Sequence, residues 1–186
     1  MAFVKLLKQN SVFHRKKTDY LHPMQTTFST VRLHLDMVTT DDYAFVSALV
    51  NSCGWLEFIG DRNVHGKQDA IAYINKILDA PNIHYWVIRV KGSGTPVGII
   101  SFIKRDYLDY YDIGFALLSE YSGLGYAYEA AKEVLMFASN VAEHHPIVAT
   151  TLINNNSSIK LLTKLGLHFD KEIIVENEIL HLYSNG

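Results

Sequence analysis

The chain has 186 residues, 48% of them hydrophobic, and its 17 Lys and Arg residues against 19 Asp and Glu residues give a formal net charge of -2. This length is typical of one domain with its own hydrophobic core, and the near balance of charge argues against a nucleic-acid binder that works through bulk positive charge. No apolar run approaches the roughly 20 residues of a membrane-spanning helix, and the single cysteine, Cys53, excludes an internal disulfide, so we expect a cytoplasmic protein with no membrane partner.

The first 29 residues differ from the rest of the chain. They contain one anion, Asp19, and five cations: Lys5, Lys8, Arg15, Lys16 and Lys17. Because terminal segments often lack tertiary anchors, we predict a partly ordered N-terminal extension over residues 1–29 that packs on a single domain over residues 30–186. A basic arm for an anionic partner is the alternative interpretation.

A short strand and two helices open the domain. Residues 31–35 alternate apolar and polar side chains, which is the pattern of a half-buried strand. Helix-capping residues at 39–42 precede apolar residues at helical spacing, and a second helical stripe covers residues 68–78. The segment between them, residues 53–66, carries three glycines and is predicted to be irregular.

The rest of the chain alternates between strand and helix patterns. In chain order we predict three strands, a helix, a strand, a helix and two strands, at residues 85–90, 96–103, 113–118, 124–139, 146–152, 157–165, 167–174 and 178–183. Short connections between the first three strands favour an antiparallel meander. The whole order predicts a mixed α/β domain in which helices cover the faces of one sheet.

Two glycines mark the turn between the strand at 113–118 and the helix that follows. Gly123 and Gly125 let backbone approach a ligand closely, and the first N–H groups of a helix have no partner inside it. Together with the helix dipole, this arrangement suits a diphosphate. Position 128 is Tyr128 rather than a third glycine, and no Gly-Lys-Ser or Gly-Lys-Thr follows, so neither the dinucleotide fingerprint nor the Walker loop is present.

These residues resemble the motifs of one family. The stretch 122–127 is similar to Gln/Arg-x-x-Gly-x-Gly/Ala of the GNAT superfamily of N-acetyltransferases, although Ser122 stands where the family has Gln or Arg. Asn155, Ser158 and the run 164–167 resemble the second signature of the superfamily. The stretch 126–131 is similar to the RimJ/RimL-like branch, and the resemblance extends over roughly residues 30–183.

The resemblance implies a fold, a reaction and a cofactor site. The fold would be the GNAT fold (mixed α+β), a mostly antiparallel central sheet splayed between its fourth and fifth strands and flanked by helices. The reaction would move the acetyl group of acetyl-CoA to a primary amine of a peptide N-terminus or a small molecule, by direct attack and without metal. The cofactor would be held by Leu117, Ser119, Gly123, Leu124, Gly125, Tyr126, Ala127 and Asn155.

The proton acceptor is less directly indicated. Asp112 begins the strand that should contact the thioester, and it shares one face with Gly114 and Ala116, whose small side chains would leave room for an acceptor. We therefore expect Asp112 to be the general base. Three candidates for binding the acceptor lie in the 53–66 segment, namely Glu57, Asp61 and Arg62, and the two carboxylates are also rivals for the role of the base. Arg62 would hold an acceptor carboxylate or phosphate, or pair with Asp61.

Several alternatives stay open. Many members of the superfamily have a tyrosine acid at the position of Leu162, which the helical stripe of residues 157–165 instead predicts to be buried. This departure keeps a non-catalytic acyl-CoA-binding or sensor domain as the alternative function. The nine histidines show no zinc spacing, and adjacent His144 and His145 cannot face one metal, so we expect no metal site. No nucleic-acid partner is expected, and the protein would be a monomer or a homodimer.

Overall fold

The computed structural model describes residues 24–141 and 144–186. The predicted N-terminal extension therefore lies outside the described residues as far as Pro23. Its last part is strand β1 (Thr27–Ser29), which pairs antiparallel with β2 (Leu33–Met37). The end of the extension is thus built into the sheet of the domain.

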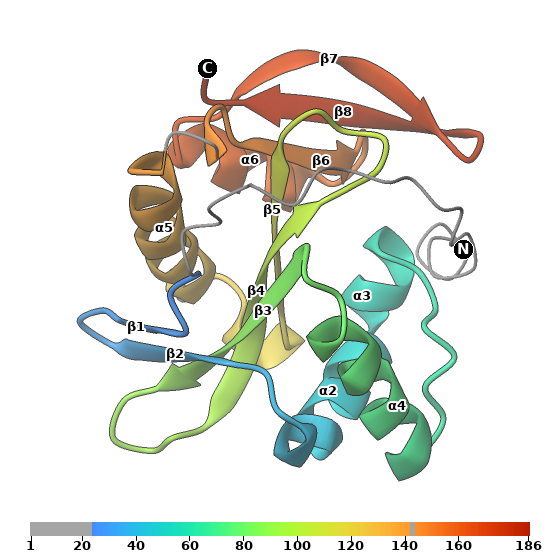
Figure 1. Cartoon of the computed structure of the whole chain (residues 1–186), viewed down its shortest axis with the longest axis vertical. Coiled ribbons are helices and arrows are strands. Elements are labelled where there is room, and N and C mark those ends of the chain that lie inside the picture. The colour runs from blue at the N-terminus through green and yellow to red at the C-terminus, as the bar shows by residue number, and fades with distance from the viewer. Residues whose placement is uncertain (1–23, 142–143) are drawn as a thin grey trace, which may run out of the picture.

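One eight-stranded sheet runs through the molecule in the order β1-β2-β3-β4-β5-β6-β8-β7 (Figure 1). The remaining strands are β3 (Ile83–Val90), β4 (Pro96–Lys104), β5 (Tyr111–Leu117), β6 (Val148–Leu152), β7 (His168–Val175) and β8 (Glu178–Ser184). Every neighbouring pair is antiparallel except β5 and β6, which are parallel and share a single register pair, Asp112 with Val148. The predicted mixed α/β fold is confirmed. The fourth and fifth predicted strands, between which the sheet was expected to splay, are β5 and β6.

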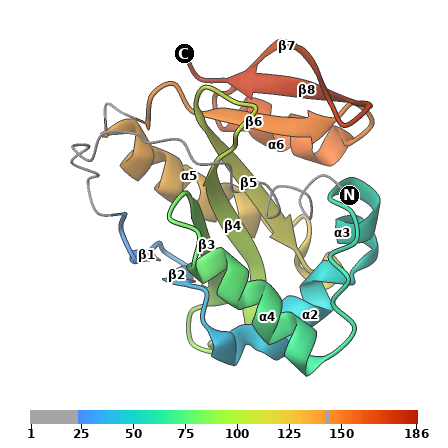
Figure 2. The same cartoon turned by 45° about the vertical axis from the view of Figure 1, so that its right-hand side comes forward.

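Helices cover the two faces of the sheet unequally. Helices α2 (Tyr43–Val50), α3 (Cys53–Phe58) and α4 (Lys67–Leu78) lie on one face, and α5 (Tyr126–Ser139) lies on the other (Figure 2). The short helix α6 (Asn156–Lys164) packs beside β6, and two 3₁₀ turns cover Thr40–Asp42 and Ser119–Tyr121. Each face has its own core because side chains alternate along a strand. Trp86 and Ile88 of β3 pack with α5, whereas Tyr85 and Val87 pack with α2 and α4.

The prediction of irregular structure over residues 53–66 is wrong for its first half, which forms α3. Trp55 is the cause, because its side chain is buried in the core between the sheet and α2 and α4. Its indole Nε1 donates to the carbonyl of Gly60 at 3.1 Å, and its own carbonyl accepts from the N–H groups of Ile59 and Gly60. Burial of one large aromatic side chain thus ordered a short helix that glycine content argued against.

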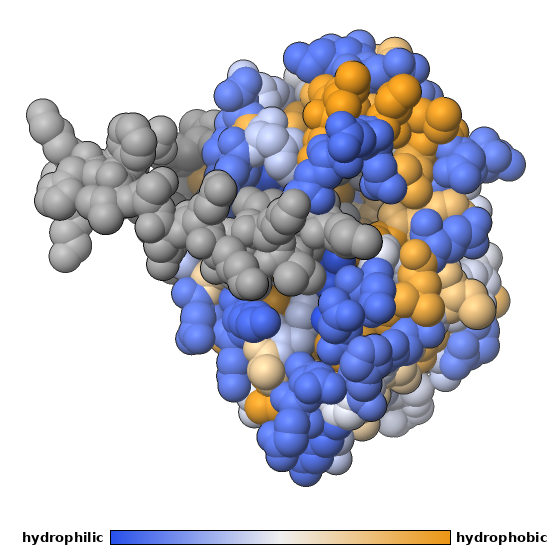
Figure 3. All heavy atoms as spheres, turned by 90° about the vertical axis from the view of Figure 1, so that its right-hand side faces the viewer, coloured by the Kyte–Doolittle hydropathy of each residue, from blue (hydrophilic) through white to orange (hydrophobic). Residues whose placement is uncertain are grey.

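A row of isoleucines lies exposed at the end of the β7–β8 hairpin. Ile174 of β7 pairs with Ile179 of β8, and Ile153 follows the end of β6 beside them. Their exposed fractions are 75%, 47% and 52%. Figure 3 shows hydrophobic side chains gathered in the upper part of this side of the molecule, where the hairpin ends. No helix in the described part of the chain is long and apolar enough to cross a membrane.

Replacing Leu162 tests the core beneath α6. Its side chain is 2% exposed and packs with Leu167, Ala149 and Tyr183, so the predicted burial is confirmed. Leu162→Ala should lower the free energy of unfolding by about 2–5 kcal/mol, because truncation of a buried leucine leaves a cavity. Urea denaturation measures the loss, and Lys160→Ala on the exposed side of the same helix is the control, with a change within about 0.5 kcal/mol. An equal effect of the two substitutions would contradict the packing argument.

Candidate functional site

The end of β5 leaves backbone groups unused on the side of β6. The N–H of Leu118 donates to the carbonyl of Val97, so this residue bonds toward β4. Alternation along an antiparallel ladder then directs the N–H and C=O of Leu117 the other way, toward β6. Because β6 pairs with β5 only at Asp112, the backbone of Leu117 has no ladder partner on β6, and we call this unpaired stretch between the two strands the gap. An extended ligand there could hydrogen-bond to β5 like an additional strand.

A turn with two left-handed glycines connects β5 to α5. Gly123 has φ +76° and Gly125 has φ +81°, a region that glycine enters without strain. Gly125 is the N-cap of α5, and Tyr126 and Ala127 form its first turn, so their N–H groups have no partner within the helix. A Cβ at Gly123 would meet no described atom within 4 Å, which leaves the turn open for a bulky anion.

Two other predicted cofactor residues also lie in this turn. Ser119 begins the 3₁₀ turn that follows β5, and its carbonyl accepts from the N–H of Ser122 at 3.1 Å. Leu124 is 51% exposed, and its carbonyl accepts from Arg32 Nη1 at 3.0 Å. The structure therefore brings the predicted residues 117–127 together in one continuous element around the start of α5.

Arg32 is a member of this site that the sequence did not reveal. The Nε of Arg32 lies 2.6 Å from Glu129 Oε2, its backbone N–H donates to Oε1, and its guanidinium lies 4.6 Å from the ring centre of Tyr126. A Cβ on Gly125 would lie 3.3 Å from Arg32 Nη2, which places the positive charge directly beside the turn. The two charged residues are 97 positions apart and share no motif, so only the fold brings them together.

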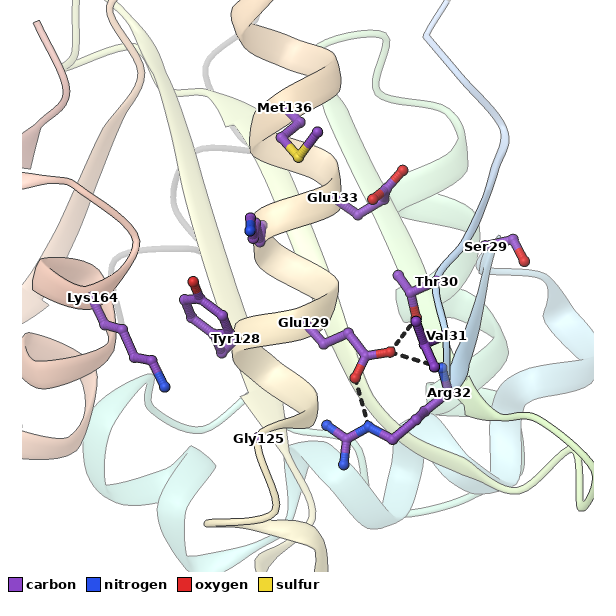
Figure 4. Close-up of a pocket in the computed structure, with 11 residues that line it drawn as sticks. Ser29, Thr30, Val31, Arg32, Gly125, Tyr128, Glu129, Glu133, Met136 and Lys164 are labelled. Carbon is purple, nitrogen blue, oxygen red and sulfur yellow. Dashed lines mark hydrogen bonds and ion pairs between the residues drawn. The ribbon is translucent and has the colours of Figure 1, made fainter.

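Glu129 holds Arg32 in place from the first turn of α5 (Figure 4). Burial by itself raises the pKa of Glu129, but hydrogen bonds from the Thr30 hydroxyl and from Arg32 outweigh it and lower the pKa below its usual value. The carboxylate therefore stays ionised to lower pH than an ordinary glutamate. It fixes the guanidinium near Gly125 throughout the neutral range.

A groove of about 730 Å³ runs along α5 next to the turn. Arg32 and Glu129 lie on one side of α5 in Figure 4, while Tyr128 and Lys164 lie on the other. The Lys164 ammonium is 4.4 Å from the centre of the Tyr128 ring. Arg32, from the connection before β2, and Lys164 of α6 therefore flank the start of α5, where the helix dipole also favours negative charge.

Asn155 lies at the N-terminus of α6 as its capping residue. Its Oδ1 accepts from the N–H of Ser158 at 3.1 Å, so this oxygen serves the helix. The side-chain amide keeps its two N–H donors for another partner. Gly166 ends the helix in the left-handed conformation with φ +88°, as its sequence pattern predicts.

Asp112 does not have the surroundings expected of a general base. Its side chain is 3% exposed, Oδ2 lies 2.5 Å from Arg105 Nε, and Oδ1 accepts from the N–H of Thr150 at 3.0 Å. Burial raises the pKa of the Asp112 carboxyl, while the charge and hydrogen bonds of Arg105 oppose that rise. Burial lowers the pKa of Arg105, but Asp112 outweighs it and raises that pKa. Both carboxylate oxygens of Asp112 are therefore occupied inside the protein, one in an ion pair with Arg105 and the other by the Thr150 N–H.

The small residues on the same face as Asp112 have close neighbours within the domain. A Cβ on Gly114 would lie 2.6 Å from the hydroxyl oxygen of Ser101, which faces it from β4. Ala116 is half-buried and packs against the core between the sheet and α2 and α4. Close packing within the domain therefore accounts for small residues at 114 and 116 without an acceptor.

The three residues predicted from the 53–66 segment have different environments. Glu57 is exposed on α3. Asp61 is exposed, and its Oδ1 accepts from the N–H of Asn63 at 2.7 Å. Arg62 donates to the carbonyl of Ile59 at 3.2 Å, and its guanidinium lies 5.8 Å from the ring centre of Trp55.

Arg62 belongs to a group of polar side chains on the α2–α4 face of the sheet. Burial raises the pKa of Tyr73 and of Tyr85, and Arg62 acts against the rise at both phenols. The charge of Arg105 also lowers the pKa of Tyr85, and the charge of Asp112 raises it. Within residues 24–141 and 144–186, no group of three or more His, Cys, Asp or Glu side chains could hold a metal ion.

Comparison with known proteins agrees with this geometry. The family model described as "Acetyltransferase (GNAT) domain" matches residues 32–168. The uncharacterized N-acetyltransferase YnaD of Bacillus subtilis is 26% identical over 139 residues, which are 75% of this chain and 81% of YnaD.

Solved structures share the fold at lower identity. A GNAT-family acetyltransferase from Bacillus anthracis superposes with a TM-score of 0.72 at 24% identity, covering 85% of this chain and 96% of that one. RimL, described as a ribosomal α-N-protein acetyltransferase, has a TM-score of 0.70 at 11% identity, covering 83% and 90% of the two chains. With a strand gap and an open glycine turn in place, and a family model matched over 32–168, the chain belongs to the GNAT acetyltransferase family.

Proposed function

We propose that this protein binds acetyl-CoA and transfers its acetyl group to a primary amine. The observation that supports it most is the combination of the gap beside Leu117 with the open turn at Gly123 and Gly125. A long ligand with an extended arm and a diphosphate fits such a continuous site, because the arm needs strand-like hydrogen bonds and the diphosphate needs N–H groups. Arg32 and Lys164 supply positive charge for the phosphates.

The residues of the chain would act in the transfer mainly by binding and orientation. The first N–H groups of α5 and the guanidinium of Arg32 hold the diphosphate, and the side-chain amide of Asn155 donates from across the gap. A backbone N–H near Leu117 polarises the thioester carbonyl. The neutral amine nitrogen then bonds to the carbonyl carbon and the carbon–sulfur bond breaks. The nitrogen gives up one proton to become the amide, and the departing thiolate takes up a proton.

The acceptor amine must lose a proton before it attacks. A peptide α-amine has a pKa of about 7.7–8.0, whereas a lysine-like amine is near 10.4, so the first is far easier to deprotonate at neutral pH. With Asp112 enclosed, Glu57, Asp61 and a water chain on backbone groups are the candidates for the proton acceptor. The RimL similarity supports a peptide N-terminus or another accessible amine as the acceptor.

Release of free thiol from acetyl-CoA tests the proposal. Incubation with acetyl-CoA and a panel of α-amino peptides, polyamines and small amines should give acceptor-dependent thiol release. Tight binding of acetyl-CoA by calorimetry without release for any acceptor would instead support a non-catalytic acyl-CoA sensor. The burial of Leu162 where many relatives have a tyrosine acid is the observation that favours this second function.

Substitution of Gly123 tests the phosphate turn. Gly123→Glu places a carboxylate in the open space where the diphosphate should bind, and like charges repel. Gly123 is a better position than Gly125, because a carboxylate at 125 would meet Arg32. Calorimetry should show acetyl-CoA binding reduced below detection.

A matched glycine separates this charge effect from backbone strain. Gly92 lies in the β3–β4 turn with φ +85° and has equally open surroundings. Gly92→Glu therefore carries the same strain and the same charge away from the site, and it should bind acetyl-CoA like the unaltered protein. Equal affinities of the two variants would remove the turn from the cofactor site.

Arg32→Ala tests the cation beside the turn. The Arg32 side chain is 45% exposed, so its loss should weaken acetyl-CoA binding by only about two- to tenfold. The difference from the unaltered protein should shrink as salt is raised, because ions screen an exposed charge. Lys76→Ala, which removes an exposed cation from α4, should leave affinity unchanged. A salt-independent loss would indicate that Arg32 only supports the turn.

A further inference from the structure

The pairing between β5 and β6 stops at an unusual point. Val148 faces Asp112 in the single register pair of these parallel strands. On the other side of β6, Ile147 accepts a hydrogen bond from Asn185, so alternation turns the backbone of residues 148 and 150 toward β5. The next N–H that could continue the ladder is therefore that of Thr150. It donates to the side chain of Asp112 instead of to a β5 carbonyl.

The Asp112 carboxylate therefore joins three segments of the chain. It belongs to β5, its Oδ1 accepts from β6 through Thr150, and its Oδ2 binds Arg105 in the connection between β4 and β5. The side chains of the pair are 3% and 19% exposed, so water does not compete for these bonds as it would at the surface. Breaking one partner of such a pair leaves a buried charge without compensation.

We propose that Asp112 is a positioning residue that fixes where β5 and β6 separate, and hence the width of the gap that receives the pantetheine arm of acetyl-CoA. The carboxylate ends the ladder by taking the N–H that would otherwise draw β6 onto β5. Arg105 prevents the carboxylate from swinging away. This inference rests on the proposed function, since the gap matters only if an extended ligand enters it.

The pantetheine arm and the diphosphate occupy different parts of the site, which makes the proposal testable. The arm lies between the strands, while the 3′-phospho-ADP portion of the cofactor lies at the glycine turn. An amide at position 112 offers one acceptor oxygen where the carboxylate has two, so it cannot satisfy both Arg105 and Thr150. Asp112→Asn should weaken acetyl-CoA binding by about ten- to a hundredfold and leave binding of 3′-phospho-ADP unchanged.

Other roles of Asp112 would give other results. A general base would leave both affinities unchanged and lower turnover, with recovery at high pH as the free amine accumulates. A purely structural residue would lower the melting temperature and leave both affinities unchanged well below it. An equal loss of both affinities would mean that the glycine turn is damaged. Each of these three outcomes overturns the proposal.

Two further variants complete the test. Asp109→Asn removes an exposed carboxylate from the same β4–β5 connection and should change neither affinity. Arg105→Lys keeps the positive charge but loses the hydrogen bond from Nε to Asp112. It should therefore weaken acetyl-CoA binding by a smaller factor than Asp112→Asn does. It should also disturb folding less than Asp112→Asn, because the buried carboxylate keeps a cation beside it. Unchanged acetyl-CoA affinity in Arg105→Lys and Asp112→Asn alike would refute the role of the ion pair.

Failure of the proposed function is distinguishable from failure of this inference. A protein that binds neither acetyl-CoA nor 3′-phospho-ADP does not have the proposed function. Hydrogen exchange at the Thr150 amide then tests the contact alone, because it needs no ligand. Faster exchange in Asp112→Asn than in Asp109→Asn supports the junction, and equal exchange refutes it.

Discussion

The separation of β5 from β6 is the constraint on which the remainder of the site depends. A continuous parallel ladder would occupy the backbone groups around Leu117 and close the sheet, whereas here the two strands pair only at Asp112 and Val148 within the described residues. The open edge of β5 then leads directly into the glycine turn and the start of α5. The buried carboxylate of Asp112, bound by Arg105 and Thr150, lies at the point where β5 and β6 stop pairing.

The site is also supported from outside the motif. Arg32 and Thr30 lie in the connection between β1 and β2 and bind Glu129 on α5, so the start of α5 is bonded to the β1–β2 edge of the sheet. Positive charge near the turn thus comes from the helix dipole and from the side chains of Arg32 and Lys164. The short strand β1 pairs with β2 and so extends the sheet next to the contact between Arg32 and Glu129. The last residues of the N-terminal extension therefore have a structural role.

The sequence was sufficient for the features that are local. Apolar periodicity predicted the helices at 68–78 and 124–139, and the glycines at 123, 125 and 166 predicted turns that do have positive φ. The sequence was insufficient where contacts between residues far apart in the chain determine the local structure or the surroundings of a side chain. The burial of Trp55 created α3, Arg32 met Glu129 across 97 positions, and Arg105 with Thr150 enclosed an Asp112 that spacing had suggested as a base. Strand alternation gave the correct face for Asp112 but not its neighbours.

Ser101 and Gly114 lie so close together that a substitution at one position affects which residues fit at the other. A Cβ at 114 would lie 2.6 Å from the Ser101 hydroxyl oxygen, so alanine at 114 requires this hydroxyl to rotate away or to be lost. Alanine at 101 removes the oxygen and should make alanine at 114 easier to accommodate. Homologous sequences should therefore show alanine at 114 more often beside a residue without a hydroxyl at 101 than beside serine.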